Sequence, residues 1–140
     1  MFRPEELPED LSGYNPVLLG FWCDRWDAPD DMLKVAPRLH NKKIGCFATM
    51  GGDPDDEKAK QWMMKTSEKL VNMGEGNTLG ETFLCRGRID PEVFKRMTEL
   101  LGGKVSPERE ARRKACETHP DRLDLERAAE LFRGFFGANW

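Results

Sequence analysis

The sequence predicts an α/β protein built on a parallel sheet with flanking helices. Two short, nearly unbroken apolar runs at about 17–23 and 43–50 carry this prediction. Each run ends abruptly in loop-forming or charged residues and is followed by a segment with helical periodicity. A strand that is apolar on both faces, followed by a turn and a helix, is typical of a buried parallel sheet. Ligands bind beyond the carboxyl ends of the strands in such sheets, so we seek a site in the loops after these runs.

Length and composition narrow the class of protein. The chain has 140 residues, a formal net charge of −3 and 34% charged residues. This length predicts one domain with a real core, and there is no basic surplus to neutralise nucleic-acid phosphates. No apolar run approaches the roughly 20 residues of a membrane span, and the four cysteines include no Cys-x-x-Cys pair. We therefore expect a reduced, cytoplasmic protein that binds neither nucleic acid nor membrane.

The first third of the chain predicts an arm, a strand and a short helix. Residues 1–15 are acidic and rich in proline, and we expect an extended arm before a single domain over 16–140. After the first strand, Asp27 is expected to cap a helix. Pro37 lies within the apolar periodicity of that helix and should kink or shorten it.

The rest of the chain predicts a longer helix, a third strand and three more helices. Asp53 is expected to cap a helix from Pro54 to about Met73, with its apolar positions at helical spacing. The run at about 79–85 is a shorter third strand. The last three helices are expected at about 91–101, 107–118 and after Asp121, with Asp90 and Ser106 at the start of the first two.

Three segments with strand-and-loop character carry a resemblance to a known family. They are Gly20–Asp24, Phe47–Pro54 and Gly80–Asp90, and the tail with His119-Pro120-Asp121 fits the same group. Together they resemble the successive motifs of the flavodoxin-like, FMN-binding family, and within it the BilS-type flavodoxins. The resemblance runs from about Leu11 to Phe136.

The resemblance implies a flavodoxin-like sheet of order 2-1-3-4-5 with FMN at its carboxyl edge. The three strands of this chain correspond to the third, fourth and fifth of the family, so we expect an N-terminally truncated flavodoxin with extra C-terminal helices. The family's first strand and its Ser/Thr-Gly-rich phosphate loop have no counterpart before Pro16. Losing about three charge-assisted hydrogen bonds would cost on the order of 4–9 kcal/mol, which makes FMN binding by this chain micromolar at best.

A missing first strand also affects the sheet edge. The strand at 17–23 is apolar enough to be central, yet it would lack a neighbour on one side. Because an uncovered apolar edge pairs readily with another chain, we expect either self-association or burial of this edge by the arm at 1–15.

The resemblance assigns cofactor-binding residues to three loops and no catalytic residue. They are Trp22, Cys23, Asp24 and Trp26 in the first loop, Thr49, Met50, Gly51, Gly52 and Asp53 in the second, and Cys85 and Arg86 at the end of the third strand. A tryptophan of the first loop would stack on the flavin ring, and the glycines would let backbone amides approach its pyrimidine edge. Arg86 could replace part of the phosphate contact or hold a reduced, anionic flavin.

Each of these assignments has a structural alternative. Trp22 could pack in the core, Trp26 could merely cover a helix, and Arg86 could be a solvated arginine. The second loop could be an ordinary strand-to-helix turn. Neither His40 nor His119 has metal-ligand partners at suitable spacing, so no metal site is predicted.

Two functional hypotheses follow. The first is an FMN-binding protein in electron transfer that serves a redox partner such as a reductase and is not a stand-alone enzyme. The second is a flavin-free binding or assembly module that acts through its exposed strand edge. The ring-binding loops favour the first hypothesis, and the missing phosphate loop favours the second.

Overall fold

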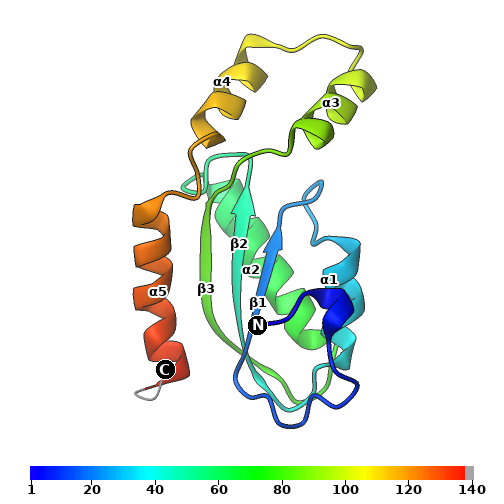
Figure 1. The fold of residues 1–140 in the computed structure, drawn as a ribbon, viewed down its shortest axis with the longest axis vertical. Coiled ribbons are helices and arrows are strands. Elements are labelled where there is room, and N and C mark those ends of the chain that lie inside the picture. The colour runs from blue at the N-terminus through cyan, green and yellow to red at the C-terminus, as the bar shows by residue number, and fades with distance from the viewer. Residues whose placement is uncertain (138–140) are drawn as a thin grey trace.

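A three-stranded parallel sheet lies at the centre of the computed structural model, which describes residues 1–137. The strands are β1 (Val17–Trp22), β2 (Lys43–Met50) and β3 (Thr78–Arg86), in that spatial order. β2 pairs in parallel with both neighbours, so all three strands end at the same edge (Figure 1). The predicted α/β fold with a parallel sheet is confirmed.

The described residues also form five α-helices and two short 3-10 helices, which lie beside the sheet or beyond its carboxyl edge. They are η1 (Pro4–Glu6), α1 (Asp30–Val35), η2 (Ala36–Arg38), α2 (Glu57–Asn72), α3 (Pro91–Leu100), α4 (Pro107–Cys116) and α5 (Arg122–Phe136). Figure 1 shows α3 and α4 beyond the carboxyl ends of the strands, and α5 alongside β3. Within residues 1–137 no helix combines the length and the apolar character needed to cross a bilayer.

Helices α2 and α5 lie against opposite faces of strand β2, whose successive side chains point to opposite sides. Ile44, Cys46 and Ala48 are fully buried, while Phe47 stays 39% exposed. Cys46 is fully buried and lies against Ser67 of α2. Its neighbour Gly45 faces α5, where a Cβ atom would come within 3.1 Å of the Phe135 ring. Glycine thus lets α5 pack closely on one face while α2 covers the other.

Two predicted helix caps were wrong, because each side chain already bonds within the preceding turn. Asp27 accepts a hydrogen bond of 2.8 Å from the next backbone amide, and Pro29 occupies the cap position of α1. Asp53 accepts from the amide of Asp55 at 2.9 Å, and α2 begins one turn later, after Asp56.

The other three predicted helix starts are confirmed. Asp90, Ser106 and Asp121 each accept a hydrogen bond from a first-turn amide of α3, α4 and α5 respectively. Pro37 falls in η2, where α1 gives way to a 3-10 turn, as its missing amide requires.

The N-terminal arm is less extended than expected, because it contains η1 and packs on the domain. Leu11 is buried in the core. The Lys42 ammonium, on a residue only 6% exposed, donates to the carbonyls of Leu11, at 2.6 Å, and Tyr14. Arg38 donates to the Pro8 carbonyl at 2.6 Å. These contacts join the arm to the segment between α1 and β2.

The four cysteines of the chain are free thiols in buried or half-buried positions. Cys46, Cys85 and Cys116 are buried and Cys23 is half-buried, and none of these four is in a disulfide. Burial raises the pKa of all four thiols, and it raises the pKa of Cys46 and of Cys85 from 9.0 to about 11. At neutral pH the thiols are therefore protonated and weak nucleophiles.

Substitution of two glycines, one in a tight backbone contact and one in open space, tests how closely the chain packs. An added Cβ at Gly74 would overlap the carbonyl oxygen of Leu39, which is fixed by a 2.7 Å hydrogen bond from Asn77. Gly74→Ala should lower the free energy of unfolding by about 2–3 kcal/mol. Gly134→Ala, in open space on α5, should raise it by about 0.5–1 kcal/mol. Urea unfolding measures both, and a neutral Gly74→Ala would contradict the described contact.

Because the thiols are buried, we expect the free energy of unfolding to fall at alkaline pH. A thiol whose pKa is higher in the folded state stabilises the fold below its unfolded pKa and loses that contribution as the pH rises toward the folded value. Between pH 9 and about 11 we expect Cys46 and Cys85 each to cost the fold on the order of 2–3 kcal/mol. Urea unfolding at about pH 8 and about pH 10.5 measures the loss, and Cys46→Ala should shrink it. An equal loss in the variant would contradict the assignment to Cys46.

Candidate functional site

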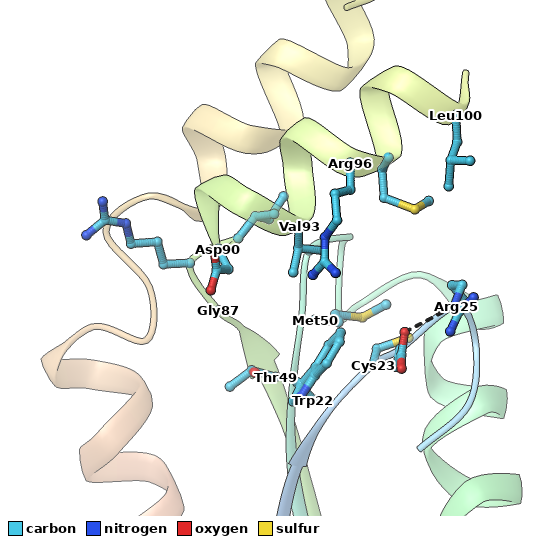
Figure 2. A pocket seen from close by; sticks show the side chains of 15 residues that line it. Trp22, Cys23, Arg25, Thr49, Met50, Gly87, Asp90, Val93, Arg96 and Leu100 are labelled. Atoms are coloured by element: carbon cyan, nitrogen blue, oxygen red, sulfur yellow. Dashed lines mark hydrogen bonds and ion pairs between the residues drawn. The ribbon is translucent and has the colours of Figure 1, made fainter. Parts of the chain in front are cut away.

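A cavity of about 860 Å³ opens where the three strands end. Its walls come from the ends of β1 and β2, the loop after β3, and α3 (Figure 2). Cavities of about 300–1,000 Å³ at the carboxyl edge of a parallel sheet are typical of small-molecule sites.

The side chain of Trp22 lies in this cavity because successive side chains of β1 point to opposite faces of the sheet. Its neighbour Phe21 is buried against Trp62 of α2, with ring centroids 6.1 Å apart. Trp22, one residue later, must point to the opposite face of the sheet. On that face α5 packs against β2 and β3, and Trp22 stays 43% exposed. Figure 2 shows it below Met50 and α3.

A two-residue turn after β1 directs the neighbouring side chains of Arg25 and Trp26 to different parts of the molecule. Asp24 and Asp27 exchange two backbone hydrogen bonds of 2.9 Å, and Arg25 and Trp26 between them have φ of 49° and 61°. This left-handed conformation costs a non-glycine residue roughly 1–2 kcal/mol. The turn places Arg25 at the cavity and Trp26 on α2, where the Lys58 ammonium lies 4.3 Å from the ring centroid.

Of the residues assigned to the cofactor, about half line the cavity. Those that do are Trp22, Cys23, Asp24, Thr49, Met50 and Gly51, and those that do not are Trp26, Gly52, Asp53, Cys85 and Arg86. Asp53 and Arg86 form a pair at 3.8 Å outside the cavity, and Cys85 is buried near the start of α5. Trp26 covers a helix, as its structural alternative proposed.

Sequence reasoning missed the wall that α3 supplies. The helix itself was predicted, and its apolar positions Val93, Met97 and Leu100 recur at steps of four and three, but nothing local shows which surface this stripe faces. In the structure all three line the cavity, together with Ile89 and the guanidinium-bearing Arg96 of the same segment. The available signal was an amphipathic helix placed directly after a strand end.

Both ends of the segment that contains α3 and α4 are anchored at the end of β2. The Gly87 amide donates to the Met50 carbonyl at 3.0 Å, just before α3. The buried Cys116 thiol, at the end of α4, donates to the Gly51 carbonyl at 3.4 Å. Between the two helices, the Arg109 guanidinium lies 4.6 Å from the Phe94 ring centroid. These contacts fix the wall of the cavity relative to the sheet.

The two histidines have local structural partners. His119 has two carboxylates close by, contrary to the expectation from spacing: its Nδ1 lies 2.6 Å from Asp124 and 3.7 Å from Asp121. Those carboxylates also accept each other's amides in the capping box of α5, which explains the cluster without a metal. Nδ1 of His40 accepts a hydrogen bond of 3.0 Å from the Glu75 amide.

Comparison with known proteins identifies the family. A family model described as the flavodoxin domain matches residues 3–133. The flavodoxin-like domain-containing protein BilS of Clostridioides difficile (strain CD3) is 28% identical over 126 residues, which cover 86% of this chain and 69% of that protein. The match includes all three strands and the walls of the cavity. This chain therefore belongs to the flavodoxin domain family.

Proposed function

We propose that this protein binds FMN in the cavity at the strand ends and takes part in electron transfer. The observation that carries the proposal is the exposed indole of Trp22 inside that cavity. Trp26 is as exposed but lies outside the cavity, whereas the ring of Trp22 lines it and offers a flat conjugated ligand a surface on which to stack.

The residues around the cavity fit such a ligand. Trp22 offers a flat face, while Met50 and Val93 of α3 bound the space above it (Figure 2). Met97 of α3 also lines the cavity. The guanidinium groups at the mouth suit an anionic group on the same ligand. When bound, FMN supplies the electron-transfer chemistry, and the protein supplies binding, orientation and exclusion of water.

The partner and the compartment are part of the same proposal. The cavity contains no nucleophile with a lowered pKa, since burial raises the pKa of Cys23. A role in passing electrons to a partner reductase therefore fits this site better than catalysis by its own side chains. The four free thiols support a reducing compartment such as the cytoplasm.

A pair of tryptophan variants tests the proposal. Trp22→Ala should weaken FMN binding about 5- to 10-fold, because it removes the stacking surface. Trp26→Ala, on the other side of the same turn, should leave the affinity within about twofold. Titration of the protein with FMN, followed by flavin fluorescence, measures both. If the wild type shows no saturable quenching at high micromolar flavin, the proposal fails.

The outer edge of β1 supports a second function, pairing with another copy of this chain. In the described part of the chain β1 pairs only with β2. The Cys23 amide donates inward to the Thr49 carbonyl at 2.9 Å, so the alternate amides of residues 18, 20 and 22 point outward. Unpaired groups of this kind recruit a further strand.

Sedimentation velocity across a concentration series tests this second function. The wild type should dimerise with increasing concentration, and Leu18→Pro should remain a monomer because proline removes an outward amide and no hydrogen bond to β2. Circular dichroism confirms that the variant is folded. A wild type that stays monomeric at several hundred micromolar would exclude edge pairing.

A further inference from the structure

We propose that Arg25 and Arg96 form an anion-binding subsite at the mouth of the cavity, so that the ligand is an aromatic molecule with a phosphate group. This inference rests on the proposed flavin site and extends it: Trp22 holds the ring, and the two arginines hold the phosphate. The subsite joins the turn after β1 to helix α3, two parts of the chain about 70 residues apart.

The first observation is that Arg96 makes no ion pair among the described residues, although its helix offers two. Glu92 and Glu99 lie four residues before and three residues after it, at spacings where an ion pair stabilises a helix. Within residues 1–137 Arg96 forms neither pair and makes no hydrogen bond. Its side chain instead extends from α3 across the cavity toward Met50 and Trp22 (Figure 2). A guanidinium with free donors thus faces the space above the indole.

Arg25 is the second observation, and it is independent of the first. It has φ of 49° in a two-residue turn where Asn-Gly would be relaxed. Its side chain is 78% exposed, and among residues 1–137 it pairs only with the adjacent Asp24, at 3.3 Å. Backbone strain of this kind concentrates at ligand sites, where the position of the side chain matters more than the stability of the turn.

The charges around the mouth favour an anion. Arg88 also lines the cavity and has no ion pair in the described part of the chain. Of the two carboxylates there, Asp24 is paired with Arg25, and Asp90 accepts the Glu92 amide at 2.8 Å to cap α3. The mouth therefore carries a positive surplus in a chain of net charge −3. A planar guanidinium binds phosphate through two parallel hydrogen bonds.

This subsite replaces the role that the sequence suggested for Arg86. That residue lies outside the cavity, 3.8 Å from Asp53, and its guanidinium is directed to a carboxylate. Unlike Arg86, both Arg25 and Arg96 line the cavity; within residues 1–137 Arg96 has no carboxylate partner, and Arg25 pairs with the adjacent Asp24 at 3.3 Å. The charge-assisted bonds to a phosphate are thus supplied by arginines of the turn after β1 and of α3.

Parallel titrations with FMN and riboflavin test the subsite, because these flavins differ only in the phosphate. The wild type should bind FMN more tightly than riboflavin. Arg96→Gln and Arg25→Gln should each weaken FMN binding about tenfold and leave riboflavin within about twofold. The matched control is Arg122→Gln on α5, an exposed arginine paired with Glu126 at 2.8 Å, which should change neither affinity. Added salt should weaken FMN binding alone.

Arg25→Gly gives a readout that a purely structural role would not produce. Glycine relieves the left-handed strain, so this variant should melt a few degrees higher than the wild type while it binds FMN more weakly. If it is more stable and binds FMN with unchanged affinity, Arg25 is not part of the subsite.

The outcomes separate this inference from the proposed function. If both flavins bind and the ratio of their affinities is the same in the wild type and in Arg96→Gln, the subsite is overturned and the ring site stands. If neither flavin binds the wild type, both proposals fall. A preference for FMN that is lost on mutation of either arginine supports both.

Discussion

The parallel pairing of β2 with both neighbouring strands is the constraint on which the site depends. Because all three strands run the same way, the turn after β1, the loop after β2 and the exit of β3 meet at one edge. Ile44, Cys46 and Ala48 of β2 are fully buried, with α2 against one face of the strand and α5 against part of the other, where Phe47 stays partly exposed. A rigid central strand thus fixes the base of the cavity, while its walls consist of loops and a helix.

Alternation along β1 then decides which aromatic side chain is available to a ligand. Phe21 is buried against Trp62, so Trp22 points to the open face. The left-handed turn that follows sends Trp26 to α2 and Arg25 to the cavity. The segment from Phe21 to Arg25 therefore contributes a core residue (Phe21), an aromatic wall of the cavity (Trp22) and a cation (Arg25). The backbone geometry of the strand and the turn sets the direction of each side chain.

The sequence was sufficient for the sheet and for part of the site. Apolar runs and helix caps such as Asp90 and Ser106 are local signals, and the structure confirms them. The failures at Asp27 and Asp53 were local too, because an aspartate bonds to its own turn as readily as to a helix start. Residues such as Arg96 could not be assigned from sequence, since the direction in which a helix packs depends on long-range contacts.

The anchoring of α3 and α4 has a consequence for how this cavity changes between related proteins. The segment leaves the sheet at Gly87 and returns at Cys116, and these residues bond to the carbonyls of Met50 and Gly51, which are consecutive along the chain. A longer, shorter or different helical pair could therefore be exchanged between these two points while the strand register is kept. In this architecture ligand preference can diverge by replacement of one wall, and the residues that fold the domain need not change.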